Sequence, residues 1–313
     1  MPNAIAPIAS VLNVTHKDCF DGLVSAWVVR KWAADNGYAY TTMYGDYQAP
    51  LPDISLFLDK VVVITDFSYP ISFVKEIAIV ARSIYIYDHH EAAAINFEGL
   101  MVDTLGCPVS ACFDPTRSGA GIAWNQLYPY FDVPLIVKAA QDHDLWKFEY
   151  DFTKPVMAYL GMLGLSLESV SYVHDNFALA VDKGQLLVDK DDKMVEWHLN
   201  NVYYLDLSFF NAPSVAIVNA PRYIASKVAD RLTDKYPLVI MYEDYADYRK
   251  GSLRSNGKWN INCSEIAQLY NGAGNPKTAG CRFAKDVSVD QYLLTNPRFI
   301  PLISKAAKQE TTA

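Results

Sequence analysis

The sequence predicts an α/β protein with two domains: a parallel sheet with helices on both faces, then a smaller α+β domain. Three observations indicate this class. The chain has 313 residues, more than one hydrophobic core usually serves. In its first half, short β-rich runs alternate with helical patterns, as in parallel strands joined by crossover helices. From Phe177 to about Val202, charged and apolar residues mix without proline, which is typical of a long connecting helix.

The N-terminal domain is expected to begin as strand, helix, strand, helix, strand. Its strands are predicted at Ile8–Val14, Val61–Thr65 and Ser83–Tyr87, and its first helices at Leu23–Ala34 and Ile71–Ala81. Further helices are predicted at Gly119–Tyr128, Pro134–Ala140 and Glu168–Val173. The run Val61–Thr65 is apolar or β-branched throughout, so both faces of the sheet should be covered by helices.

The C-terminal domain is expected to contain three strands and a helix. The strands are predicted at Ser214–Asn219, Leu238–Tyr242 and Tyr245–Arg254, and the helix at Cys263–Tyr270. The single glycine of the connecting stretch, Gly184, is tolerable inside a helix. We therefore predict a first domain at residues 1–185, a linker helix at 186–205 and a second domain at 206–313.

Composition predicts a soluble, cytoplasmic protein. The chain is 51% hydrophobic and 20% charged, as in ordinary globular proteins. Residues 1–14 contain no basic residue, unlike the start of a secretory signal, and no run approaches the ~18 apolar residues of a membrane span. Five scattered cysteines indicate reduced thiols rather than a cysteine-based zinc site.

Charge is unevenly distributed along the chain. The net charge is −8, but residues 221–285 contain 11 Lys and Arg against 6 Asp and Glu, which leaves 16 against 29 elsewhere. An acidic body with a basic C-terminal segment suits a protein that binds cations in one domain and phosphate in the other. Chance variation of the surface is the alternative explanation.

Acidic and imidazole side chains follow each of the three predicted N-terminal strands. They are His16, Asp18 and Asp21 after the first strand, Asp66 after the second, and Asp88, His89 and His90 after the third. Because ligands of open parallel sheets gather at the carboxyl ends of the strands, we expect these side chains to converge. Oxygen and imidazole ligands suit divalent ions such as Mn²⁺, and two ions about 3.5–4 Å apart can share a carboxylate. Alone, each residue could be a helix cap or a structural hydrogen-bonding group.

These segments resemble the motifs of the DHH phosphoesterases, a superfamily named for its Asp-His-His motif. Thr-His-Lys-Asp-Cys-Phe-Asp-Gly at residues 15–22 is similar to the first motif, Asp66 to the second, and Tyr-Asp-His-His-Glu at residues 87–91 to the third. The fourth motif, an aspartate on a later segment, is matched by Gln-Asp-His-Asp-Leu-Trp at residues 141–146. The similarity spans nearly the whole chain.

The resemblance implies a centre of two Mn²⁺ ions, or of Mg²⁺ or another divalent ion. The implied ligands are His16, Asp18 and Asp66 for the first ion, and Asp66, Asp21, His89 and an aspartate of the fourth motif for the second. Asp88 would orient the neighbouring histidine, and His90 would face the scissile phosphate.

Two positions depart from the family pattern. The aspartates of the first motif usually stand two residues apart, but Asp18 and Asp21 are three apart, and Cys19 stands where the first aspartate is expected. In the fourth motif we prefer Asp144, because an Asp-x-Trp pattern recurs in relatives. Asp142 is the alternative.

The C-terminal segments at residues 251–255 and 271–280 are similar to the Ser-x-Arg-Ser strand and the glycine-rich loop of the DHH-associated domain, the substrate platform of RecJ-like nucleases and nanoRNases. The implied substrate-binding residues are Arg254, Ser255, Gly272, Gly274, Asn275 and Lys277. A glycine-rich turn lets backbone N–H groups approach a phosphate, and an arginine can clamp it with two hydrogen bonds. Asn275 stands where the family usually has histidine and cannot carry charge, which Lys277 could supply.

The predicted function is metal-dependent hydrolysis of phosphodiester bonds in short oligonucleotides or linear dinucleotides, by hydroxide that the metal ions activate. His90, Asp88 and Arg254 are the expected catalytic residues. The partner is a short single-stranded nucleic acid or a nucleotide, without a membrane and with a homo-oligomer possible. The alternatives are a single-stranded DNA exonuclease, a cyclic-nucleotide phosphodiesterase, a pyrophosphatase or a non-catalytic nucleotide-binding module.

Overall fold

The chain folds into two compact units that divide between Val188 and Asp189. The computed structural model describes residues 10–17, 19–97 and 106–307, and Asp18 lies outside these ranges, as do Ile8 and Ala9 of the first predicted strand. The division falls inside helix α8 (Phe177–Leu199). None of the helices in the described ranges is long and apolar enough to cross a membrane.

The first unit is built on a five-stranded parallel sheet with the strand order β2-β1-β3-β4-β5. Its strands are β1 (Ser10–His16), β2 (Ala39–Gly45), β3 (Val61–Thr65), β4 (Ser83–Asp88) and β5 (Val109–Phe113). Its helices are α1 (Phe20–Asp35), α2 (Ile71–Val80), α3 (Glu91–Phe97), α4 (Gly119–Leu127), α5 (Leu135–Asp144), α6 (Thr153–Leu163) and α7 (Leu167–Asp175). The predicted α/β class is confirmed.

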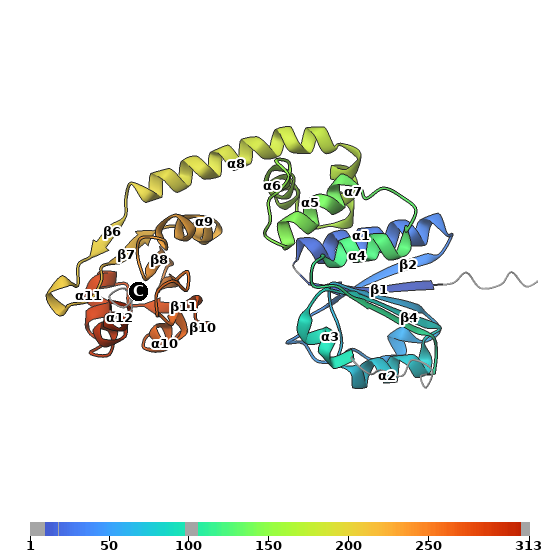
Figure 1. The fold of residues 1–313 in the computed structure, drawn as a ribbon, viewed down its shortest axis with the longest axis horizontal. Coiled ribbons are helices and arrows are strands. Elements are labelled where there is room, and N and C mark those ends of the chain that lie inside the picture. The colour runs from blue at the N-terminus through green and yellow to red at the C-terminus, as the bar shows by residue number, and fades with distance from the viewer. Residues whose placement is uncertain (1–9, 18, 98–105, 308–313) are drawn as a thin grey trace, which may run out of the picture. The chain divides into compact units, whose positions relative to one another are not determined.

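Helices cover both faces of this sheet (Figure 1). Helices α1 and α4 lie on one face with α5, α6 and α7 packed outside them, around a core that includes Trp27, Trp124 and Ile136. Helices α2 and α3 lie on the other face, where Ile64 and Phe73 belong to the core. The middle strands are apolar because neither face meets water.

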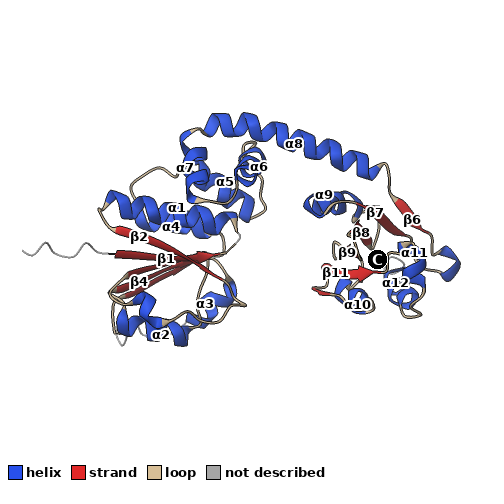
Figure 2. Cartoon of the chain, turned by 180° about the vertical axis from the view of Figure 1, so that it is seen from behind, coloured by secondary structure: helices blue, strands red, loops and turns tan. Residues whose placement is uncertain are grey.

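The second unit contains a six-stranded sheet with the order β10-β11-β9-β8-β7-β6, in which only the pair β7 and β8 is parallel (strands in red, Figure 2). The strands are β6 (Tyr203–Leu205), β7 (Val215–Asn219), β8 (Val239–Asp244), β9 (Arg249–Arg254), β10 (Ala273–Gly274) and β11 (Thr278–Phe283). The helices are α9 (Arg222–Leu232), α10 (Cys263–Gln268), α11 (Val289–Leu294) and α12 (Phe299–Ala307).

Several element boundaries differ from the predicted ones, and two differences affect the site. Helix α1 begins at Phe20, because Cys19 takes an extended backbone as its N-cap, so Asp21 lies on the first helical turn rather than in a loop. Helix α5 continues to Asp144 and carries both aspartates of the fourth motif. The strand predicted at Tyr245–Arg254 begins only at Arg249, because Tyr245 N donates to Tyr248 O across a turn.

Gly184 shows why a glycine stands inside the long helix α8. A Cβ atom at this position would lie 1.8 Å from the carbonyl oxygen of Pro155 in α6. The cost of glycine in a helix is therefore offset by the close approach of the two helices.

Candidate metal centre

The strand register places the ends of β1, β3 and β4 in one row. Thr15 pairs with Thr65, and Thr65 pairs with Tyr87. The residues that follow these three positions are His16, Asp66 and Asp88. The parallel sheet therefore delivers two carboxylates and an imidazole to the same edge, as expected for a ligand site in an open α/β sheet.

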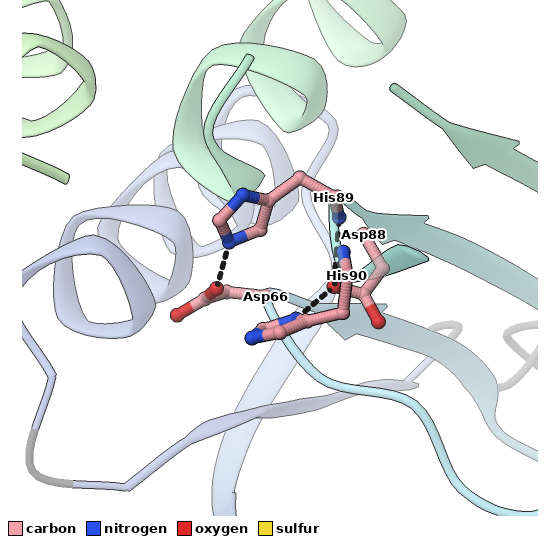
Figure 3. A group of neighbouring side chains, drawn as sticks. All are labelled: Asp66, Asp88, His89 and His90. Atoms are coloured by element: carbon pink, nitrogen blue, oxygen red, sulfur yellow. Dashed lines mark hydrogen bonds and ion pairs between the residues drawn. The ribbon is translucent and has the colours of Figure 1, made fainter. Parts of the chain in front are cut away.

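Asp66 lies at the centre of this row in a conformation that few residues adopt. Its φ angle is 51°, in the left-handed region that is uncommon for residues other than glycine. Its side chain is 2% exposed. Oδ1 lies 3.1 Å from Nε2 of His89 (Figure 3). The buried Oδ2 has no hydrogen-bond partner in the described chain and lies 3.8 Å from Nδ1 of His16. A buried carboxylate oxygen without a partner is costly and calls for a cation.

Two glycines from different helices leave room only for backbone beside Asp66. A Cβ atom at Gly22 in α1 would lie 2.5 Å from His16 O and 3.2 Å from Asp66 Oδ2. A Cβ atom at Gly119, the first residue of α4, would lie 2.6 Å from the Asp66 Cβ. Both helices therefore approach the carboxylate more closely than any side chain would allow.

A second set of ligand atoms comes from α1, from the residue that follows β4, and from α5. Asp21, His89 and Asp144 offer one ligand atom each, and these atoms lie within 4.8 Å of one another. His89 Nε2 lies 3.6 Å from Asp144 Oδ2. Asp21 is buried and accepts hydrogen bonds of 3.2 and 3.4 Å from Ala120 N, near the start of α4.

The pKa values show how crowded the negative charge is. Burial raises the pKa of Asp21 well above its ordinary value, and the nearby carboxylates of Asp66 and Asp144 raise it further. Burial also raises the pKa of Asp144, which His89 partly opposes. A hydrogen bond to Asp66 raises the pKa of His89 to about 9, against the effect of burial. Three carboxylates gathered beside one another must either hold protons or be balanced by cations.

Asp88 orients the ring of His90 rather than that of His89. Its Oδ1 lies 2.7 Å from Nδ1 of His90 and also accepts from the backbone N of His89 at 2.8 Å (Figure 3). Oδ2 accepts a 2.6 Å hydrogen bond from Ser68 Oγ. The hydrogen bond to Asp88 raises the pKa of His90. With Nδ1 held in this way, Nε2 is the ring nitrogen that faces away from Asp88.

The donor set fits divalent metal ions. Three overlapping groups within the described residues place their ligand atoms within 4.8 Å: Asp66, Asp88, His89 and His90; His16, Cys19 and Asp66; and Asp21, His89 and Asp144. Carboxylate and imidazole predominate in all of them, which is the mixture that Mn²⁺ and similar ions accept. The orphaned Oδ2 of Asp66 supports the same conclusion from an independent observation.

Asp142 has a different environment from Asp144, although both lie in the last turn of α5. Its carboxylate accepts hydrogen bonds from Glu149 N at 2.9 Å, from Tyr150 N at 3.2 Å and from Thr153 Oγ1. Its oxygens are therefore occupied by the chain segment that follows the helix. Asp144 lies among the candidate ligands instead.

Two neighbours of the centre were missed by the sequence analysis. Tyr47, 56% exposed, lies on the loop after β2, and its ring centroid is 5.6 Å from that of His16 and 6.1 Å from that of His90. Cys19 joins His16 and Asp66 in one ligand group. Burial raises the pKa of the Cys19 thiol to about 12, and Asp66 adds to this. The cysteine stood inside the first motif and could have been considered; Tyr47 carries no comparable signal.

The second unit contains a cavity of about 330 Å³ with a basic lining. Arg254 and Gly274, both predicted for substrate binding, line it together with Arg222 and Lys250, which were not predicted. Arg254 Nη1 donates to Ser252 Oγ at 2.8 Å and to Leu253 O at 3.0 Å, which fixes the guanidinium. Three cations and one acidic residue, Glu243, make this cavity suited to an anion.

The other four predicted substrate-binding residues are not part of the cavity lining. Ser255 is buried, with its Oγ lacking a hydrogen-bond partner in the described chain, and Gly272 is packed against the carbonyls of Gly280 and Ala267. Asn275 Oδ1 accepts from the backbone N of Lys277 at 3.0 Å and of Thr278 at 2.9 Å. The amide oxygen of Asn275 therefore shapes its own turn, which a histidine ring could not do in the same way.

Comparison with known proteins shows which sequences and folds this chain resembles. No protein-family model matches the chain. An uncharacterized protein of Acanthamoeba polyphaga mimivirus is 26% identical over 295 residues, which cover 86% of this chain and 66% of the viral protein. The pGpG-specific phosphodiesterase PggH of Vibrio cholerae has a TM-score of 0.56 at 12% identity, covering 95% of this chain and 99% of that one. RecJ of Thermus thermophilus in complex with Mn²⁺ has a TM-score of 0.51 at 14% identity, covering 96% and 52%.

The chain therefore shares its fold with PggH and with RecJ. The resemblance drawn from the motifs is confirmed at the level of the fold. The chain spans just under two thirds of the viral relative that it matches.

Proposed function

We propose that this chain is a phosphodiesterase that depends on divalent metal ions and hydrolyses short oligonucleotides or linear dinucleotides. The observation that carries the proposal is Asp66, a buried carboxylate at the meeting point of three strand ends, with an oxygen that no donor among the described residues satisfies. The fold shared with a dinucleotide phosphodiesterase and a nuclease supports it.

The assignment of ligands follows the geometry. His16 and Asp66 would hold the first ion. Asp21, His89 and Asp144 would hold the second, together with Asp66, which is a ligand of both. Asp18, which lies outside the described residues, is proposed for the first ion from the motif alone. When bound, the two ions would lower the pKa of a water molecule and neutralise charge on the phosphoryl oxygens.

The remaining residues act on the substrate directly or hold those that do. His90, oriented by Asp88 and with its pKa raised by it, would donate a hydrogen bond from Nε2 to a phosphoryl oxygen. Asp88 stays ionised in this arrangement, because hydrogen bonds from His90 and Ser68 lower its pKa against the opposing effect of burial. An ionised Asp88 accepts the Nδ1 proton of His90 and favours the imidazolium form, in which Nε2 also carries a proton that it can donate.

The basic cavity of the second unit would bind an end phosphate of the substrate. Arg254, held by Ser252, offers its free guanidinium N–H groups, and Arg222 and Lys250 add positive charge. A preference for short substrates would follow from the need for an end phosphate at this cavity.

The test compares substrates on metal-depleted protein with and without added Mn²⁺. The substrates are a 5′-labelled RNA dinucleotide, a 24-mer of single-stranded DNA, cyclic nucleotides and pyrophosphate. We expect Mn²⁺-dependent cleavage of the dinucleotide, faster than that of the 24-mer. Protein with His89→Ala, purified identically, reveals any contaminating nuclease. Preferred cleavage of the 24-mer, of a cyclic nucleotide or of pyrophosphate would replace the substrate assignment, and no cleavage with saturable dinucleotide binding would indicate a binding module.

A further inference from the structure

The segment that follows α5 holds two aromatic residues in an unusual backbone conformation. Trp146 has a φ of 56° and Phe148 a φ of 52°. Bulky residues rarely adopt this left-handed region, and such outliers persist only where the surrounding structure enforces them. Two of them within three residues indicate that this segment is built to a particular shape.

Hydrogen bonds to the last turn of α5 enforce that shape. Lys147 N donates to Asp142 O at 3.0 Å, and Trp146 N donates to His143 O at 3.1 Å. The Asp142 carboxylate binds the backbone N atoms of Glu149 and Tyr150. The segment from 145 to 150 is therefore tied to the helix from both sides of Trp146.

The strain does not serve to bury the indole. Trp146 is 66% exposed. Its ring centroid lies 4.9 Å from that of Phe148 at an interplanar angle of 74°, and 6.1 Å from that of His143 at 63°. Both neighbours meet the indole at a steep angle rather than face to face, so they support it without stacking over it. Lys154 Nζ lies 4.9 Å from the Phe148 centroid and adds positive charge beside this aromatic pair.

Trp146 lies close in the chain to the candidate metal centre. Trp146 follows Asp144 by two residues, so their Cα atoms are within about 8 Å of each other. The His143 ring, which contacts the indole, also contacts Phe20 at 5.4 Å, and Phe20 directly precedes Asp21. The rings of Trp146, His143 and Phe20 therefore form a chain of contacts. Phe20 is adjacent in sequence to the candidate ligand Asp21, and His143 is adjacent to the candidate ligand Asp144.

We propose that Trp146 is a platform on which a nucleobase next to the scissile phosphodiester stacks, a proposal that rests on the proposed function. Stacking on an aromatic side chain tolerates any base sequence, because every base has a π-face. The strained backbone fixes the indole before substrate arrives, which reduces the entropy lost on binding. Trp146 therefore acts as a positioning residue that touches the substrate, distinct from the metal ligands.

The test uses two substrates that differ only in the bases. One is an RNA dinucleotide, and the other is the same dinucleotide with abasic sugars. For Trp146→Ala we expect KM for the base-bearing substrate to rise about tenfold or more, with kcat changed little and the abasic substrate unaffected. Trp146→Phe should recover most of the loss. Tyr130→Ala is the matched control, because it removes an aromatic side chain that is 94% exposed between α4 and α5. It should change neither KM nor kcat for either substrate.

Trp146→Gly separates stacking from loop geometry. Glycine adopts a φ of 56° without strain, so this variant should melt at or above the wild-type temperature while KM rises as in Trp146→Ala. Equal losses with the base-bearing and the abasic substrate would overturn stacking and assign the residue to loop structure. If wild-type protein cleaves neither substrate, the proposed function fails separately. Equilibrium binding of the labelled dinucleotide then decides, and equal affinity of wild type and Trp146→Gly overturns the platform.

Discussion

Strand β3 has an aspartate with left-handed backbone near each of its ends, and the two have opposite surroundings. Asp59 (φ 57°) precedes the strand, and Asp66 (φ 51°) follows it. The Asp59 side chain is 66% exposed, and both of its oxygens meet the guanidinium of Arg82, with Nη2 at 2.9 Å from Oδ2. The Asp59 carboxylate is therefore compensated by the protein itself.

Asp66 has the same residue type and the same left-handed backbone but no guanidinium beside it. No lysine or arginine among the described residues forms an ion pair with Asp66. Two histidines and further carboxylates surround it instead. The comparison shows that left-handed aspartate alone says nothing about function. A buried carboxylate with one unsatisfied oxygen, and with histidines and further carboxylates around it in place of lysine or arginine, is what marks one end of the strand as a candidate site.

The largest expected effect is the difference in activity between variants of these two aspartates. Asp66→Asn should lower kcat/KM for an RNA dinucleotide at least about 1000-fold, which is about 4 kcal/mol of transition-state stabilisation. Asp59→Asn should stay within about twofold. Asparagine tolerates the left-handed region, so both backbones are kept. Steady-state assays in Mn²⁺ measure both, and thermal melting checks folding. Asp66→Asn with more than a tenth of wild-type activity would contradict the assignment.

Metal removal should give the next largest effect, which is measured on the free energy of unfolding instead of on turnover. Because a ligand that binds only the folded state stabilises it, Mn²⁺ at about 100 times its Kd should add about 2.7 kcal/mol to the free energy of unfolding. Thermal melting with Mn²⁺ and then with EDTA should show the gain and its reversal in wild type and in Asp59→Asn. Asp66→Asn should lose most of the gain. An equal gain in all three proteins would mean that Mn²⁺ binds elsewhere.

The same contrast distinguishes the two aspartates of α5. Asp142→Ala leaves two backbone N–H groups and Thr153 without their acceptor, and it should lower the free energy of unfolding by about 2 kcal/mol. Asp144→Ala should weaken Mn²⁺ binding with little loss of stability. Urea unfolding of the metal-free proteins and calorimetric Mn²⁺ titration measure the two effects. The reverse pattern would make Asp142 the ligand.

The smallest expected effect concerns pH at Asp59. The hydrogen bond from Arg82 lowers the pKa of Asp59 below its ordinary 3.8. The resulting stabilisation is present above the pKa of the unfolded carboxyl and is lost as the pH falls through the folded pKa. Arg82→Gln should therefore be slightly less stable than wild type at pH 7 and equally stable near pH 2. Urea unfolding at both pH values checks this, and a difference that grows in acid would exclude the explanation.

The parallel sheet was predictable where strands are buried and the motifs follow them. Val61–Thr65 coincides with β3 because its β-branched residues have helices on both sides. Strand β2 was missed because it lies at the edge of the sheet, where its side chains alternate between exposure and partial burial. In the second unit, β11 was taken for part of a glycine-rich loop, since Thr-Ala-Gly-Cys-Arg-Phe lacks the run of β-branched residues that marks a strand.

At the site, the convergence of His16, Asp66 and His89 followed from strand ends and the motif resemblance, and the structure brings these residues together. The glycine-rich loop was harder, because the same residues serve turns, packing or ligands. Gly272 serves packing, and Asn275 stabilises its own turn. Tyr47 depends on how the loop after β2 crosses the strand ends, which local sequence does not encode.

The glycine at the start of α4 has an implication for how such a site can change over evolution. With backbone alone behind Asp66, even one added methyl group at Gly119 would collide with the carboxylate's own Cβ. We therefore expect even Gly119→Ala to displace Asp66 and disturb the candidate ligands, whereas the exposed side chains of Tyr47 and Trp146 leave room for other residues.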